Sequence, residues 1–375
     1  MSASGPAEIQ QLAAEDELLE ELLACPKGRR AALLEEERFR SSAFLDLLLE
    51  ECHAALPFDP LRGEEIVSAA SVLGRRFEQE GTTDPGAELE RKCRVYCLGG
   101  TVRRLLRDHR GAEGLFEQVA FMDVGRKARA LFCQSLGLLR WDQGRYEEAA
   151  ALLHHATRRF RRQDYIRERG AFLALAGLLA VEQVAFSEAD ELLTAALPDL
   201  DAECRPWLAC GATLGLALSL CEQGFAAGEA HTARERAWRL YARIPHEEAL
   251  VGLHWLDGRV AAGLGEMADA EHLLDSVRRK FLQARRLPET ALATLHLGEI
   301  LAEAGREPEI APLVEELAAT FEGRPGLDLA LGSLRSMAAD SEAGALDHTL
   351  WLCVGSSLRT LFPHQGVFFQ PVPFA

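Results

Sequence analysis

The stretch LGLLRWDQGRYEEAAALL, from Leu136 to Leu153, decides the fold because two apolar halves flank a glycine turn. The first half carries a small residue, Gly137, and the second carries another, Ala149, twelve positions later. Gly144 stands between the halves, where a glycine typically ends a helix. We therefore expect a helical hairpin in which the two small residues face each other and allow the helix axes to approach closely.

The same spacing returns along the chain. Glycines that follow a mostly apolar residue stand at 99, 137, 177, 215, 258 and 298, which are 38, 40, 38, 43 and 40 residues apart. Ala189 follows Gly177 by twelve positions and Ala270 follows Gly258 by twelve, and a leucine stands four positions after each alanine. A near-constant period in this range is typical of stacked repeats. We expect each of these glycines, like Gly137, to lie opposite its own alanine.

These residues resemble the tetratricopeptide repeat. In the best unit the matching residues are Leu136, Gly137, Ala149, Leu153 and Ala156. The resemblance covers roughly residues 88–320. It implies an all-α fold, a right-handed superhelical solenoid of stacked antiparallel helix hairpins, with a period of about 40 instead of the family's 34. It also suggests a bacterial protein of this type.

The chain departs from the family pattern in several units. Cys133, Leu173 and His254 stand where the family usually has a tryptophan. The units of Gly99 and Gly298 lack a clear alanine in their second helix. The register around residues 222–240 stays open.

The chain is expected to have three regions. Helices are predicted over residues 6–25 and 41–55, and Ser41 or Ser42 can cap the second of them. The remaining boundaries follow from the repeat and from the proline-rich end. The predicted regions are an acidic helical N-terminal cap over 1–60, tetratricopeptide-like repeats over 61–325, and C-terminal capping helices with an extended tail over 326–375.

Charge, hydropathy and cysteine content indicate which partners and which cellular location to expect. The net charge is −17, and residues 1–60 alone hold 13 acidic and 5 basic residues. So acidic a surface repels phosphate backbones, which argues against a nucleic-acid partner. No stretch of 18 uncharged apolar residues occurs, so we expect no membrane span. Nine cysteines without a tight disulfide framework favour the cytoplasm.

Motifs for catalysis, cofactors and metals are absent from the sequence. It has no GxGxxG, GxxxxGK[ST], GxSxG, HExxH or CxxC pattern. Cys93 and Cys97 are four residues apart and should lie buried on one helix face, without the four tightly set ligands that zinc requires. We therefore predict a protein that is not an enzyme and has no catalytic, cofactor-binding or metal-binding residues.

The predicted function is a protein–protein interaction scaffold or regulatory subunit. In the tetratricopeptide family, helix positions two, five, nine and twelve of the first helix face the concave groove. The larger residues at those positions are Tyr96, Arg103, Gln134, Trp141, Trp255, Arg259 and Glu299. Aromatic and arginine side chains are enriched where binding energy concentrates, so another protein or a peptide is the expected partner.

Two alternatives remain at this point. The repeat array could instead sense a ligand such as a small peptide or a nucleotide. The tail from Pro363 to Ala375, rich in phenylalanine and proline, either packs on the last repeat or docks on another chain, including by self-association.

Overall fold

The computed structural model describes residues 6–56, 59–80, 84–159, 166–203, 205–224, 227–244 and 250–322, together with the single residues 332, 335, 336 and 339. Apart from those four single residues, the predicted C-terminal region and its tail lie outside the described residues. By its internal contacts the chain divides into two compact units between Leu139 and Arg140. We call the part up to Leu139 the first unit and the part from Arg140 the second unit. The boundaries predicted from the sequence for the cap and the repeats remain predictions.

Every regular element of the described residues is helical, as the sequence predicts. The first unit contains α1 (Pro6–Ala24), α2 (Lys27–Leu33), the short 3-10 helix η1 (Glu37–Phe39), α3 (Ser42–Ala55), α4 (Pro60–Glu80), α5 (Pro85–Leu105), α6 (His109–Ala120) and most of α7 (Arg126–Asp142). The second unit continues with α8 (Tyr146–Arg159), α9 (Ile166–Glu182), α10 (Phe186–Ala196), α11 (Pro206–Glu222), α12 (Ala227–Tyr241), α13 (Val251–Gly263), α14 (Met267–Gln283), α15 (Leu287–Glu303), the 3-10 helix η4 (Glu307–Glu309) and α16 (Ile310–Phe321).

Side-chain caps set where the helices of the first unit begin. The Ser41 hydroxyl accepts a hydrogen bond from the Phe44 backbone N–H at 2.9 Å, so the predicted cap of α3 is confirmed. The Asp84 carboxylate accepts from two backbone N–H groups at the start of α5, and Pro85 occupies the first turn. Behind these caps, Phe39 and Phe44 meet edge to face with ring centroids 5.4 Å apart in a buried aliphatic cluster.

A residue in the left-handed conformation ends the first helix of each hairpin. These residues are Arg107, Gly144, Val184, Gly224, Gly265 and Gly305, with φ of 64°, 70°, 61°, 70°, 79° and 68°. Their spacings are 37, 40, 40, 41 and 40 residues. At most of these turns the following N–H donates to a carbonyl five residues earlier, as from Arg145 to Arg140 at 2.8 Å. This is the Schellman motif, which closes the end of an α-helix.

The turns fix the repeat register and correct two sequence assignments. The residues seven positions before each turn residue are Gly100, Gly137, Gly177, Ala217, Gly258 and Gly298. The first repeat is therefore aligned on Gly100 and not on Gly99. In the fourth repeat Ala217 takes the glycine position. Gly215 instead packs on the preceding hairpin, where a methyl group at Gly215 would lie 3.0 Å from Leu178.

The predicted pairing of glycine with alanine is wrong by one helical turn. A methyl group at Gly177 would lie 2.5 Å from the Cγ atom of Leu193, and one at Gly258 would lie 2.9 Å from the Cγ atom of Leu274. Each glycine thus faces the leucine 16 positions later in its own hairpin. The small residue makes room for that branched side chain, and the alanine four positions earlier is buried beside it.

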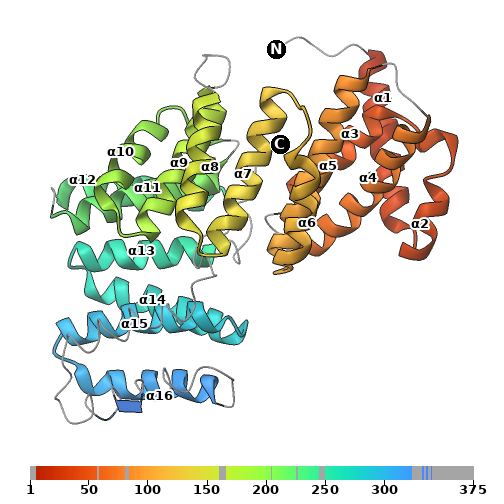
Figure 1. Ribbon diagram of the computed structural model, residues 1–375. Coiled ribbons are helices and arrows are strands. Elements are labelled where there is room, and N and C mark those ends of the chain that lie inside the picture. The colour runs from red at the N-terminus through yellow and green to blue at the C-terminus, as the bar shows by residue number, and fades with distance from the viewer. Residues whose placement is uncertain are drawn as a thin grey trace. The chain divides into compact units, whose positions relative to one another are not determined.

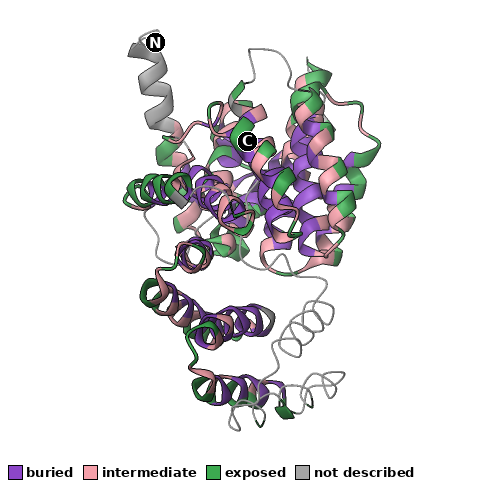
Figure 2. Ribbon diagram, turned by 90° about the vertical axis from the view of Figure 1, so that its left-hand side faces the viewer, coloured by how far each residue is buried: buried purple, intermediate pink, exposed green. Residues whose placement is uncertain are grey.

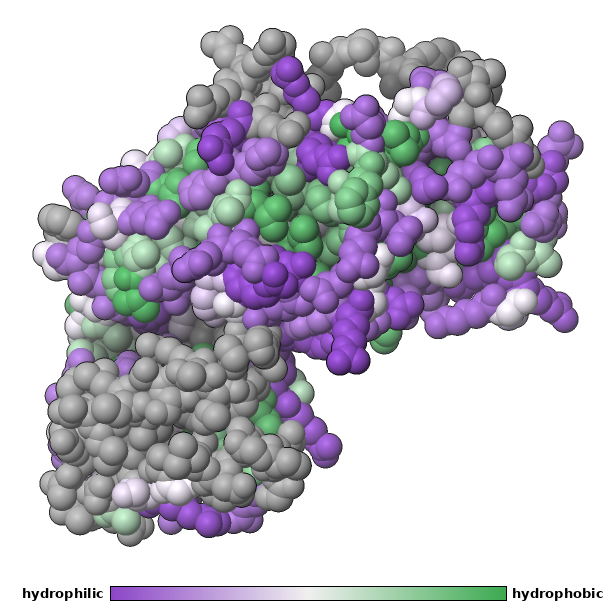
Figure 3. Space-filling model, in the orientation of Figure 1, coloured by the Kyte–Doolittle hydropathy of each residue, from purple (hydrophilic) through white to green (hydrophobic). Residues whose placement is uncertain are grey.

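Within the second unit, successive helices from α13 to α16 lie in layers (Figure 1). Their buried side chains lie along the faces by which the helices contact one another (Figure 2). Hydrophilic side chains predominate on the face in Figure 3, with smaller hydrophobic areas between them. No helix among the described residues combines the length and the apolar character needed to cross a membrane.

Candidate functional site

The structure places the predicted partner-binding residues of the first unit in three different environments. Tyr96 on α5 lines a pocket and is half-buried. Arg103 is exposed near the end of α5 and forms an ion pair of 2.9 Å with Asp108, the N-cap of α6. Gln134 on α7 is fully buried. These three residues therefore do not form one surface.

Two buried tryptophans of the second unit link neighbouring hairpins. The Trp141 indole N–H donates to a Glu182 carboxylate oxygen at 2.6 Å, which ties the end of α7 to the end of α9. The Trp255 indole N–H on α13 donates to Nδ1 of His296 on α15 at 3.0 Å, and both residues are buried. Each tryptophan meets its partner 41 residues later, one repeat along.

Arg259 extends this connection toward α11. Its guanidinium forms an ion pair of 2.9 Å with Glu222 at the end of α11 and lies over the Trp255 ring, 5.2 Å from the centroid. Glu222, Arg259, Trp255 and His296 therefore form one polar and aromatic chain across the first helices of three successive hairpins. We call it the α11–α13–α15 chain. Glu299, the last predicted residue, is half-buried on α15 one turn beyond His296.

A second network, which the sequence analysis missed, lies between α12 and α13. Arg234 is 1% exposed, and its Nε donates to Asp257 Oδ1 at 2.5 Å. It also pairs with Glu266 and lies 4.7 Å from the Trp238 ring centroid. The Trp238 indole N–H donates to the other Asp257 oxygen at 3.0 Å. Burial alone would lower the pKa of Arg234, but the Asp257 hydrogen bond and the nearby carboxylates raise it overall, so the guanidinium stays charged.

Both charged residues occupy positions that are apolar in other repeats. Asp257 stands directly before Gly258, where the corresponding residues include Leu136 and Leu297. Arg234 lies between the buried Ala230 and Ala237 on α12, as Leu193 lies between the buried Ala189 and Ala196 on α10. Arg234 therefore takes the place that Leu193 has in its hairpin. An Arg–Asp pair thus replaces two leucines at one repeat interface. The sequence signal that could have revealed this network is a charged residue at each of two positions that are apolar in the other repeats.

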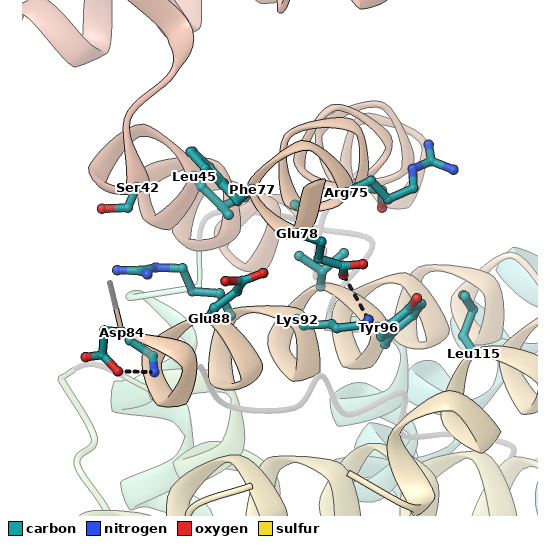
Figure 4. Close-up of a pocket in the computed structure, with 15 residues that line it drawn as sticks. Ser42, Leu45, Arg75, Phe77, Glu78, Asp84, Glu88, Lys92, Tyr96 and Leu115 are labelled. Carbon is teal, nitrogen blue, oxygen red and sulfur yellow. Dashed lines mark hydrogen bonds and ion pairs between the residues drawn. The ribbon is translucent and has the colours of Figure 1, made fainter. Parts of the chain in front are cut away.

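The pocket that Tyr96 lines lies between α5 and the pair α3 and α4, with Leu115 of α6 at one end (Figure 4). Its volume is about 570 Å³. Lys92 forms an ion pair of 2.9 Å with Glu78 across it, and the Glu78 hydrogen bond raises the pKa of Lys92. Both charges of this pair are therefore already compensated. A volume of this size falls in the range of small-molecule sites.

Four cysteines of the first unit, Cys52, Cys93, Cys97 and Cys133, are buried, and Cys25 is half-buried. The Sγ atoms of Cys93 and Cys97 lie 3.9 Å apart on one face of α5, as the spacing predicts. Burial raises the pKa of Cys97 well above its usual range, and the Cys93 side chain adds to the increase. Among the residues that the structure describes, no group of three or more histidine, cysteine or acidic side chains is arranged to hold a metal ion.

Comparison with known proteins gives structural matches alone. No family model matches the chain, and neither does any curated protein sequence. Among solved structures, a Rap protein in complex with competence and sporulation factor matches with a TM-score of 0.59 and 14% identity, covering 86% of this chain and 88% of that one. The chain has a Rap-like fold. The apo form of RapI matches with a TM-score of 0.51 and 11% identity, covering 86% of this chain and 99% of that one.

The matched Rap structures are helical-repeat solenoids, in agreement with the predicted all-α repeat fold. At these identities the likeness concerns the fold and not the individual residues of a site. The α11–α13–α15 chain and the pocket beside Tyr96 are therefore features of this sequence, and they are interpreted on their own geometry.

Proposed function

We propose that this chain is a non-enzymatic regulatory or scaffold protein that binds a peptide or a protein segment beside the α11–α13–α15 chain. The observation that carries the proposal is the position of Arg259. Its side chain is 17% exposed, lies on a tryptophan and is held by Glu222, so its guanidinium is oriented before any partner arrives. Preorganised arginine and aromatic groups are the side chains that most often dominate binding energy.

The likeness to a Rap protein that was solved with competence and sporulation factor supports a role in binding another molecule. The fold accounts for the described chain, and no described segment stands apart as a catalytic domain. The partner is expected to offer a carboxylate, because a guanidinium binds carboxylates through charge-assisted hydrogen bonds. Cytoplasmic location and bacterial origin belong to this proposal.

The test is a selection of binding peptides from a random library with the purified full chain, followed by affinity measurement through fluorescence anisotropy. We expect an enriched acidic peptide whose affinity falls at least tenfold in Arg259→Gln. Arg236→Gln is the matched control, because Arg236 is an exposed arginine on α12 that does not belong to the α11–α13–α15 chain. Equal affinity in both variants, or the absence of any enriched peptide, contradicts the proposal.

The alternative of a ligand-sensing regulator has one observation in its favour. The pocket of the first unit is large enough for a small molecule and lies outside the α11–α13–α15 chain.

A further inference from the structure

Trp238 on α12 holds its indole ring in a fixed orientation at the surface of the second unit. The residue is 45% exposed. Its indole N–H donates to Asp257 at 3.0 Å, and the Arg234 guanidinium lies over one side of the ring, 4.7 Å from the centroid. Ala242, one helical turn later, is exposed and too small to cover the ring. The ring is therefore oriented before any ligand arrives, and part of it stays accessible.

One guanidinium beside the ring is shared by three carboxylates. Arg234 forms ion pairs with Asp257 at 2.5 Å, with Glu266, and with Asp269 at 3.8 Å. Arg234 and Asp257 are buried, whereas Glu266 is half-buried and Asp269 is exposed. The four side chains carry a net formal charge of −2, so uncompensated negative charge remains at the surface.

A fourth carboxylate lies beside the ring. Glu235 is exposed and stands three residues before Trp238. Because helical side chains lean toward the N-terminus, the ring lies over the turn that carries Glu235. His231 connects Glu235 with Glu266, since its two ring nitrogens lie 3.4 and 3.5 Å from their carboxylate oxygens. The local net charge is therefore −3 when His231 is neutral and −2 when it is protonated.

The nearest exposed arginines of α12 do not face the ring. Arg236 and Arg239 stand two residues and one residue from Trp238, and side chains so spaced point to different sides of a helix. The excess charge around the accessible part of the ring is therefore negative. A cationic group suits this surface, because tryptophan is the aromatic side chain that binds cations best.

We propose that Trp238 and Glu235 bind an arginine side chain from a basic segment of a partner protein. The guanidinium stacks on the accessible part of the ring and donates hydrogen bonds to the Glu235 carboxylate. Glu266 and Asp269 add attraction at longer range, and the net charge of −17 draws a basic partner toward the chain. This inference goes beyond the proposed function, because it concerns another surface and a ligand group of the opposite charge.

The experiment follows the indole N–H signals of the full chain by NMR during titration with the blocked pentapeptide Gly-Arg-Gly-Arg-Gly. The Trp238 signal is identified by its absence in Trp238→Phe. We expect this signal to shift saturably while the signals of Trp141 and Trp255 stay in place. The citrulline counterpart, in which a neutral urea replaces each guanidinium, should bind at least fivefold more weakly, because it loses both the cation–π contact and the ion pair.

Variants then test the two contacts, with affinities measured by fluorescence anisotropy of a rhodamine-labelled pentapeptide. Glu235→Gln should weaken binding about threefold, and the matched control is Glu191→Gln, an exposed glutamate on α10, which should bind normally. Trp238→Leu should bind at least threefold more weakly than Trp238→Phe. Both tryptophan variants lose the hydrogen bond to Asp257, so the difference between them isolates the aromatic ring.

Arg259→Gln should bind the pentapeptide normally, which separates this inference from the proposed function. Four results would overturn the inference. They are no shift of the Trp238 signal up to about 10 mM peptide, equal binding of the arginine and citrulline peptides, equal affinity in Glu235→Gln and Glu191→Gln, or equal affinity in Trp238→Leu and Trp238→Phe.

Discussion

Replacing the Arg234–Asp257 pair by the leucines of the other repeats should show how the α12–α13 interface is stabilised. In Asp257→Leu the buried guanidinium keeps Glu266 and, at 3.8 Å, Asp269, but loses Asp257, the most buried of its three partners. In Arg234→Leu the Asp257 carboxylate, 3% exposed, loses the guanidinium and keeps the hydrogen bond from the Trp238 indole N–H. The double variant Arg234→Leu/Asp257→Leu removes both charges and restores the apolar pattern.

The expected magnitudes differ between the single and double variants. Removing one member of a buried ion pair costs about 3–5 kcal/mol, because an uncompensated charge remains buried. Asp257→Leu should fall near 3 kcal/mol, since Glu266 still offsets the charge of Arg234, and Arg234→Leu should fall near 5 kcal/mol. The double variant should lie within about 1 kcal/mol of the natural chain, because apolar replacement of a buried pair is often neutral or stabilising. The coupling energy is then about 7–9 kcal/mol.

Hydrogen exchange followed by mass spectrometry measures the free energy of local opening at this interface, in peptides that cover α12 and α13. A loss of about 3 kcal/mol speeds exchange through local opening about 150-fold, since each 1.4 kcal/mol is a factor of ten. Single variants within 1 kcal/mol of the natural chain would refute the reasoning. So would a double variant as unstable as the sum of the two single variants, because the costs would then be independent.

Three further predictions concern the hairpins. Val184→Gly should raise the free energy of unfolding by about 1 kcal/mol in urea denaturation, because exposed Val184 holds a left-handed φ of 61° that glycine adopts without strain. Gly144 holds a φ of 70° at the equivalent turn, so Gly144→Val should lower the free energy of unfolding. Gly177→Ala should lower it by about 1–3 kcal/mol, because the new methyl group must displace Leu193; unchanged stability would disprove this packing. The Gly111 backbone N–H in the first turn of α6, and then the Arg103 side chain, donate hydrogen bonds that lower the pKa of Asp108 below its usual 3.8. The stability lost in Asp108→Asn at pH 7 should therefore disappear as the pH falls through that lowered pKa, and a loss that persists at pH 2 would contradict it.

The sequence predicted the hairpins because their small residues and turns recur at an almost constant period. The register was harder to predict where that pattern is ambiguous. Two consecutive glycines, Gly99 and Gly100, both fit the first repeat, and only the φ of Arg107 decides between them. In the fourth repeat Ala217 stands at the glycine position, and Ala230 follows Gly224 by six residues where Ala149 follows Gly144 by five. Gly215 offers a false match.

The candidate site was predicted less completely, because helical position indicates a face but not the partner that covers it. Trp141 and Trp255 were predicted to face a partner-binding groove, and in the structure both are buried against residues one repeat away. Their partners, Glu182 and His296, each follow 41 residues later, a relation visible in the sequence only once the repeat is aligned. The contact of Arg259 with Glu222 and Trp255 follows from side-chain packing, which periodicity does not encode.

The central claim is that a peptide partner binds beside the α11–α13–α15 chain, and its most direct test is hydrogen exchange with and without the selected peptide at saturating concentration. The account predicts slower exchange in segments 206–222, 251–263 and 287–303, with no change in α3 to α6 of the first unit. Protection confined to the first unit, or spread evenly along the chain, would contradict it.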